Sequence, residues 1–470
     1  MLLNKNFITT YKIPLLLVLA SMLFYWSFAY NLVRTDYIKL VTLYSALFYL
    51  FYKIVNIFKQ NTKALTAFAF CFRAFFILAI PNLSQDFYRF IWDGRLIFAG
   101  YNPYLYSVQT FLENDIFPIP QAEILRQGMG QLNASHFSNY PPLNQLCFFL
   151  AALISNHNIL GSVIVLRVII ILADFGTLYF GKKLLKDLNL PEHKIYWYIL
   201  NPFIIIELTG NLHFEGVMIF FLVWSLYLLQ QKKSMLAALT FACSISIKLF
   251  PLMLLPLFFQ WFITKKNRNN VKHFNLKSLS SKLLKLVLFY IIVIGVTLLL
   301  FLPFYNSNLI SNYTTTTTLW FNNFEFNASL YYIARAIGYS FRGHNEIAII
   351  GKLSQIIVIL FIIAISFFRK NRTLPQLISA MLFVLSFYFF TATTVHPWYI
   401  STLLILSVFT NYKFPLVWSY IIILSYLAYL NTNSMDKSEN LWVIALEYIV
   451  VFSVFLFEIF KKKSVDHKLL

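Results

Sequence analysis

One stretch of this chain reads Leu284-Lys-Leu-Val-Leu-Phe-Tyr-Ile-Ile-Val-Ile-Gly-Val-Thr-Leu-Leu-Leu-Phe-Leu-Pro303. Its single charged residue, Lys285, lies near the start of the stretch. A helix needs about 20 mainly apolar residues to cross a bilayer, because in lipid the backbone can satisfy its hydrogen bonds only within the helix. The stretch therefore predicts a membrane-spanning helix.

Comparable stretches recur almost from end to end of the 470 residues, of which 59% are hydrophobic and 12% charged. Mean hydropathy is +0.68, far from that of soluble globular domains. We expect a single all-α polytopic membrane domain over 1–470, with about 14 transmembrane helices and at least 12. The predicted spans are 13–31, 38–56, 64–81, 158–181, 195–210, 214–230, 234–249, 250–264, 284–303, 346–368, 374–392, 398–411, 415–430 and 441–460.

The net charge of +20 would suggest nucleic acid as a partner of a soluble protein. Here the Lys and Arg residues lie in short runs between apolar segments, so membrane lipids are the expected partner and nucleic acid is not. The positive-inside rule puts the runs at 182–194 and 265–285, and both termini, on the cytoplasmic side. This topology requires 142–156 to be a partial or re-entrant helix; a full crossing would put 182–194 outside.

Two long connections, 82–141 and 304–345, are predicted on the outer side. Loops of this length are more often functional than idle. The first begins with Ser84-Gln-Asp-Phe-Tyr-Arg-Phe-Ile-Trp-Asp-Gly-Arg-Leu-Ile-Phe-Ala-Gly-Tyr-Asn-Pro-Tyr104. At 100° per residue, Asp86, Arg89 and Asp93 share one arc and apolar residues fill the next. This pattern predicts an interfacial amphipathic helix with its charges at the level of the headgroups.

A carboxylate in that position can act as a general base that deprotonates an acceptor hydroxyl, and Asp86 is the candidate. The alternative is that Ser84 caps the helix and Asp86 only complements the helix dipole. Arg89 and Asp93 are candidates for substrate binding, or else an ordinary i, i+4 pair.

The motifs resemble those of the superfamily C membrane glycosyltransferases, especially bacterial polyprenol-phosphomannose-dependent mannosyltransferases. Four segments carry the resemblance, and they occur in the expected order: Asp86 to Tyr104, Tyr140-Pro-Pro-Leu143, Lys248-Leu-Phe-Pro251 and His396-Pro-Trp-Tyr399.

The resemblance implies inverting transfer of a hexose, most often mannose, from a polyprenyl phosphate sugar to a lipid or glycan acceptor. It places the reaction at the outer face of a bacterial inner membrane, with Asp86 as the base. Some relatives carry a tighter acidic pair for a divalent cation. Here Asp86 and Asp93 are seven residues apart and Gln85 precedes Asp86, so no metal or other cofactor is expected and a divalent cation has no support.

Other polar residues fall at the outer boundary of the predicted spans: His213, Glu215, Lys248 and His396. Lys248 and His396 could hold a lipid-linked phosphate, because the leaving group needs a cation or a hydrogen-bond donor. The alternatives are snorkelling for Lys248, a turn at His396, and a solvated loop for His213 and Glu215. Tyr140 could stack on a sugar or anchor the chain at the interface.

Three further expectations follow from the residue pattern. Arg167 and Asp174, seven apart on one predicted helix, are expected to form an intramembrane pair or network. Cys71, Cys147 and Cys243 lack the spacing of a disulfide framework or zinc site, and no nucleotide-binding fingerprint occurs. The rival function is a transporter or lipid flippase, which would favour repeated halves and polar groups near the bilayer midplane.

Overall fold

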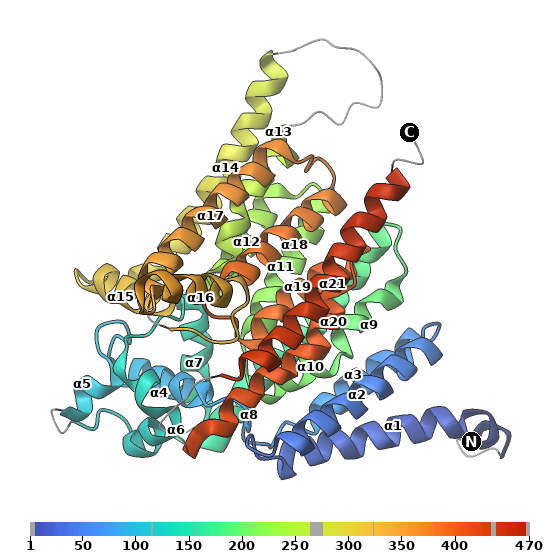
Figure 1. Cartoon of the computed structure of the whole chain (residues 1–470), viewed down its shortest axis with the longest axis horizontal. Coiled ribbons are helices and arrows are strands. Elements are labelled where there is room, and N and C mark those ends of the chain that lie inside the picture. Colours follow the sequence, from blue (N-terminus) through green and yellow to red (C-terminus); the bar gives the residue numbers. More distant parts are fainter. Residues whose placement is uncertain are drawn as a thin grey trace.

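The computed structural model describes residues 5–113, 116–155, 157–263, 276–322, 324–433 and 439–466, and this part of the chain is helical throughout (Figure 1). An isolated parallel bridge joins Phe326 to Thr394. The α-helices are α1 Lys5–Asn31, α2 Tyr37–Ile57, α3 Thr62–Ala74, α4 Asp86–Phe98, α5 Val108–Glu113, α6 Ala122–Ser135, α7 Pro142–Ser155, α8 Ile159–Asp187, α9 Tyr196–Ile199, α10 Pro202–Ile204, α11 Glu215–Gln230, α12 Ser234–Ile247, α13 Phe258–Ile263, α14 Leu276–Phe301, α15 Leu309–Asn322, α16 Leu330–Arg342, α17 Ile347–Phe368, α18 Leu374–Thr391, α19 Ile400–Val408, α20 Phe414–Ile421 and α21 Leu441–Asp466. Shorter 3-10 helices are η1 Glu192–Ile195, η3 Phe250–Leu257, η4 Leu302–Phe304, η5 Pro397–Tyr399 and η6 Ile422–Asn433, and η2 Ile205–Gly210 is a π-helix.

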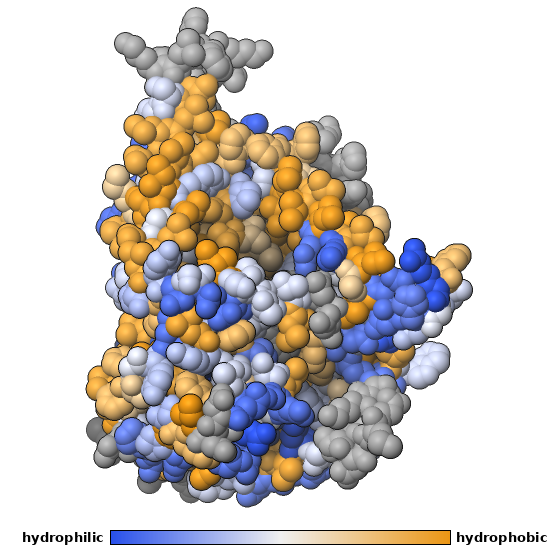
Figure 2. Space-filling view, turned by 90° about the vertical axis from the view of Figure 1, so that its left-hand side faces the viewer, coloured by the Kyte–Doolittle hydropathy of each residue, from blue (hydrophilic) through white to orange (hydrophobic). Residues whose placement is uncertain are grey.

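Seven helices in the described residues are long and apolar enough to cross a membrane, which makes this a membrane protein. They lie in α1, α2, α8, α14, α17, α18 and α21, and each coincides with a predicted span. Large apolar side chains on α14 and α17 remain exposed, among them Leu298 at 62% and Leu360 at 60%. Figure 2 shows hydrophobic residues over much of the upper part of one face, above a more hydrophilic lower part. Such a surface suits contact with lipid.

The other predicted spans form shorter or broken helices, so the prediction of about 14 crossings is not confirmed. Helix α3 ends at Ala74, well before the predicted end at residue 81. The segments Pro202–Gly210 and Glu215–Gln230 are bent by 115° relative to each other. If together they make one crossing, the described residues contain eight candidate spans. Hydropathy registers apolar composition but not a break in a helix such as the one before Pro202, so it does not distinguish a full crossing from a shorter or broken helix.

Helices α11 and α12 form an antiparallel hairpin, and the turn between them has Lys232 in the left-handed region, with φ 62°. Small residues on α12, including Ala237 and Ala238, are fully buried and allow α11 to approach. The hairpin brings Glu215, the first residue of α11, to the same end as Lys248, the residue that follows α12.

The predicted outer segments are largely helical. The segment 82–141 contains α4, α5 and α6, and the segment 304–345 contains α15 and α16; these helices lie on one side of the molecule (Figure 1). Helix α4 is buried almost all round, against α6 and α7, from Phe87 to Leu96. It is therefore a packed helix in this structure, and an interfacial position with charges open to the headgroups stays a prediction.

Gly94 permits the close approach of α4 to α7. A Cβ atom at this position would lie 2.1 Å from the carbonyl oxygen of Phe148, which is a backbone atom and cannot move alone. We expect Gly94→Ala to lower the free energy of unfolding by about 1 to 3 kcal/mol, because the helices must separate. The matched control is Gly295→Ala on α14, where nothing lies within 4 Å. Thermal unfolding of both variants in detergent checks this; equal unfolding temperatures would contradict it.

Arg167 and Asp174 do not pair with each other. Asp174 accepts a hydrogen bond from Arg73 Nε at 2.8 Å, and Arg167 donates to the carbonyl oxygens of Thr209, Gly210 and Ile77 at 2.8 to 3.0 Å. Seven residues on one helix are about 10 Å apart along its axis, which is too far for a direct pair. The network instead ties α3 and the bent segment before α11 to α8.

Candidate active site

Asp86 is the first residue of α4, and its side chain is half-buried. Its N–H donates to Ser84 Oγ at 3.3 Å, and its Oδ1 accepts from Asn133 Nδ2 at 3.4 Å. The N–H of Leu83 donates to Asn211 Oδ1 at 3.2 Å, which fixes the entry to the helix. The structure thus places Asp86 at a helix start that is held from three sides.

Lys248 and Glu215 form an ion pair, with Lys248 Nζ 3.2 Å from Glu215 Oε1. Glu215 is 1% exposed, and no donor within the described residues makes a regular hydrogen bond to its carboxylate oxygens. The Lys248 side chain is 17% exposed, and its Nζ lies 5.0 Å from the centre of the Tyr140 ring. The cation therefore faces a carboxylate on one side and an aromatic ring on another.

Asp86 belongs to this same group of charges. Burial raises the pKa of the Asp86 carboxyl above its ordinary value, and Glu215 acts in the same direction, whereas Lys248, Asn133 and Arg34 oppose it. These influences show that Lys248 and Glu215 lie within electrostatic range of Asp86 although α4, α11 and α12 are far apart in sequence. A carboxylate with a raised pKa is a stronger base than an exposed one.

An aromatic stack forms the next part of the site. Trp398 lies between two histidines, with ring centres 3.7 Å from His213 and 4.6 Å from His396. The ring centres of Phe326 and His396 are 5.1 Å apart. The backbone of Phe326 also pairs with the residues just before His396, because the N–H of Val395 donates to the carbonyl oxygen of Phe326 at 2.8 Å. The 304–345 segment thus fixes the position of His396.

Burial lowers the pKa of His396 to about 3, and the positive charge of Lys248 acts in the same direction. His396 is therefore neutral at physiological pH. It could offer an anion a ring N–H but no positive charge.

Arg89 and Asp93 form an i, i+4 ion pair at 2.8 Å in which both side chains are at most 2% exposed. Arg89 also donates to the carbonyl oxygens of Asn133 and His136, at 2.6 and 3.0 Å. Asp93 accepts hydrogen bonds from Ser138 and Gln145. In this structure the pair joins α4 to the later part of the same 82–141 segment. Neither side chain is open to a ligand.

Tyr140 is half-buried and packs with its ring centre 5.1 Å from Phe90 and 5.5 Å from Phe148. Its backbone oxygen accepts a hydrogen bond from Tyr104 Oη at 2.6 Å. Asn102 donates to the carbonyl oxygen of Phe304 at 2.8 Å. The Asn102-Pro-Tyr104 motif thus positions Tyr140 and joins the two predicted outer segments.

The sequence analysis missed Arg34 and Glu207. The guanidinium of Arg34 lies 3.9 Å from the centre of the Tyr429 ring, and Arg34 Nη1 donates to the carbonyl oxygen of Leu83 at 3.3 Å, close to Asp86. Glu207 is buried in the π-helix, accepts from Tyr426 Oη at 2.8 Å and lies 3.9 Å from His213. Arg34 follows the first predicted span on the outer side, where cations are rare, and that signal could have found it.

In the part of the chain that the structure describes, no group of three or more His, Cys, Asp or Glu side chains could hold a metal ion. The absence of a metal from the reaction stays a prediction.

Comparison with known protein families gives the class of this chain. Residues 15–265 match the family model described as alpha-(1->6)-mannopyranosyltransferase, N-terminal domain. The match covers more than half of the chain, so the chain belongs to this family of superfamily C mannosyltransferases. It is a glycosyltransferase, and the transporter alternative is set aside. No curated protein matches the chain.

Proposed function

We propose that this protein transfers a mannosyl group from a polyprenyl phosphate donor to a hydroxyl group of a lipid or glycan acceptor, with inversion. The observation that carries the proposal is that Lys248 lies within electrostatic range of Asp86, in a group that also holds Glu215 and Tyr140. A base for the acceptor and a cation for the leaving phosphate are the two groups that this chemistry needs. The printed description of the family supports an alpha-(1->6) linkage, hence a sugar 6-hydroxyl as the acceptor.

In the proposed reaction, the acceptor hydroxyl gives its proton to the Asp86 carboxylate as its oxygen attacks the anomeric carbon. The bond between that carbon and the phosphate oxygen breaks, and its electron pair leaves with the phosphate. The products are the glycosylated acceptor, polyprenyl phosphate and protonated Asp86. The developing negative charge on the phosphate is where cations and hydrogen-bond donors matter most.

Lys248 is the first candidate to hold this phosphate, and Arg34 and the neutral ring of His396 are the others. Arg34 lies next to Tyr429 and within electrostatic range of Asp86. Its planar guanidinium suits phosphate oxygens. Tyr140 offers an aromatic face on which a sugar ring can stack, whereas His213 and His396 cover the two faces of Trp398.

We further propose that the site faces the outside of a bacterial inner membrane and that both termini are cytoplasmic. Support comes from the α11–α12 hairpin, whose turn carries Lys232 and Lys233 while Glu215 and Lys248 lie at its other end. If the lysines mark the cytoplasmic side, the site lies toward the opposite face.

The donor can be tested with the purified full chain in liposomes and an acceptor glycan. Radiolabelled polyprenyl phosphomannose should support transfer, and radiolabelled nucleotide mannose should not. Transfer from the nucleotide sugar alone would overturn the lipid donor but leave the family assignment in place. Transfer to an acceptor whose 6-hydroxyl is methylated would overturn the proposed linkage.

The acid limb of the pH profile offers a second test. A base works only when deprotonated, so kcat/KM should fall as the pH drops through the pKa of Asp86, which burial raises above the ordinary value of about 3.9. Glu215 contributes to that rise, so Glu215→Gln should move the limb to lower pH. A limb that stays in place or moves to higher pH in this variant would argue against Asp86 as the titrating group.

A further inference from the structure

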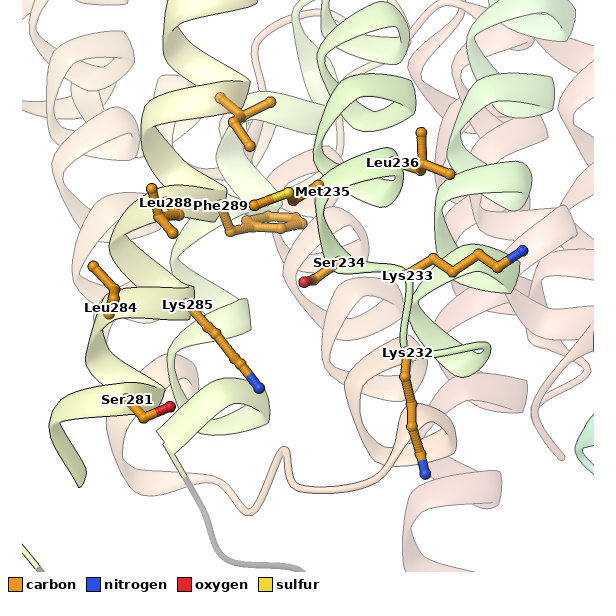
Figure 3. A pocket seen from close by; sticks show the side chains of 11 residues that line it. Lys232, Lys233, Ser234, Met235, Leu236, Ser281, Leu284, Lys285, Leu288 and Phe289 are labelled. Carbon is orange, nitrogen blue, oxygen red and sulfur yellow. The ribbon is translucent and has the colours of Figure 1, made fainter. Parts of the chain in front are cut away.

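A pocket of about 440 Å³ lies between the start of α12 and the start of α14, at the opposite end of α12 from Lys248 (Figure 3). Its polar part consists of Lys232, Lys233, Lys285, Ser234 and Ser281. Its apolar wall includes Met235, Leu284, Leu288, Phe289 and Ile292. The pocket is thus cationic at one end and apolar at the other.

The membrane level of this pocket follows from α14. The candidate span Leu279–Phe304 has 26 residues, about 39 Å of helix, close to the full thickness of a bilayer with its headgroups. Lys285 is about 9 Å from the start of this span, where headgroups meet acyl chains, and Ile292 lies deeper. In Figure 3, Lys232 and Lys285 extend toward the end of the pocket at which Ser281 lies.

Within the described residues, no ion pair neutralises Lys232, Lys233 or Lys285, although Asp187 is near enough to accept a hydrogen bond from Gln231. The first turn of α12 has no side-chain cap, so its N–H groups add to the positive field. These features all favour an anion.

The apolar wall decides what kind of anion. Met235 and Leu284 are 62% and 58% exposed, and they continue the apolar outer surface of α14. A small soluble anion would leave this wall uncovered, whereas an acyl chain would cover it at about 25 cal/mol per Å² of apolar surface.

We propose that this pocket binds an anionic phospholipid, with its phosphate at Lys232, Lys285 and the start of α12 and one acyl chain along Met235, Leu288 and Ile292. The site is separate from the candidate active site and does not depend on the proposed function. The bound lipid bridges α12 and α14, so it should also raise the thermal stability of the protein.

Native mass spectrometry of the purified full chain with phosphatidylglycerol or phosphatidylcholine tests this. We expect phosphatidylglycerol to bind at least 10-fold more tightly, and the double variant Lys232→Gln and Lys285→Gln to lose this preference. The matched control removes two exposed lysines elsewhere, Lys59→Gln and Lys63→Gln, and should keep it. Equal binding of the two lipids by the wild type, or an unchanged preference in the Lys232/Lys285 variant, would overturn the proposal.

A second variant separates lipid from soluble anion. Met235→Trp fills the apolar part of the pocket and leaves every lysine in place. If the site holds a lipid, this variant should lose phosphatidylglycerol and the stabilisation that comes with it. Two results together would show a site for soluble anions and overturn the proposal: millimolar inorganic phosphate displaces phosphatidylglycerol from the wild type, and Met235→Trp binds phosphatidylglycerol as the wild type does.

Discussion

Asp86→Asn is expected to reduce transfer by about 10²- to 10⁴-fold, the usual contribution of a general base, with little change in folding. An asparagine has the same shape, and its oxygen can still accept the hydrogen bond from Asn133. The variant loses the negative charge and, with it, the ability to take a proton. The measurement is radiolabelled mannose transfer by wild type and variant at equal abundance in liposomes, together with their unfolding temperatures.

The matched control is Asp36→Asn. Asp36 caps α2 and accepts a hydrogen bond from the N–H of Lys39, so it makes the same kind of contribution to a helix N-terminus that the structural alternative assigns to Asp86. Asparagine caps as well as aspartate, and this control should keep full activity. Equal transfer by wild type and Asp86→Asn would exclude Asp86 as the base and leave Glu215 or Asp93 to be tested.

Asp93 is the weaker of those two, for reasons that the sequence could not show. The 100° spacing put Asp86, Arg89 and Asp93 on one face, but it did not reveal that this face packs against 133–145. In the structure Asp93 is fully engaged by Arg89, Ser138 and Gln145, while Asp86, about one turn before the pair, is only partly buried. Periodicity predicts which residues share a face, and tertiary contacts decide which of them reach a substrate.

The ordered motifs were a better guide to the site than spacing. They selected Tyr140, Lys248 and His396. Tyr140 and Glu215 contact Lys248, His213 and His396 stack on Trp398, and Asp86 lies within electrostatic range of Lys248. Whether these residues bind substrate stays a prediction. Only the unusual position of a cation after the first predicted span marks Arg34, and nothing in the local sequence marks Glu207. Their contacts are with Tyr429, Leu83 and Tyr426, which are far away in the chain.

The prediction of the fold shows the same contrast between local sequence and tertiary structure. Long uninterrupted apolar runs such as 284–303 form helices that the structure confirms as candidate spans. Runs interrupted by Pro202, or by the extended backbone at Lys248, were equally apolar but form short or bent helices. These breaks also place polar groups at helix ends, which is where Glu215 and Lys248 lie.

Lys248→Gln is expected to lower transfer by about 10²- to 10³-fold, the cost of removing one group that stabilises developing charge. It should also lower the unfolding temperature, because it leaves the buried Glu215 carboxylate without its cation. Loss of activity alone would therefore not distinguish a phosphate ligand from a structural ion pair.

The double variant Lys248→Gln with Glu215→Gln makes that distinction. It replaces the ion pair by two amides of similar size, so the unfolding temperature should return most of the way to that of the wild type. Transfer should remain low, because no cation faces the leaving phosphate, whereas Lys248→Arg should retain part of it. Measured kcat and unfolding temperature for the single and double variants decide the matter. Recovery of both quantities in the double variant would mean that Lys248 serves only to neutralise Glu215, and the phosphate would then have to be held by Arg34 and His396.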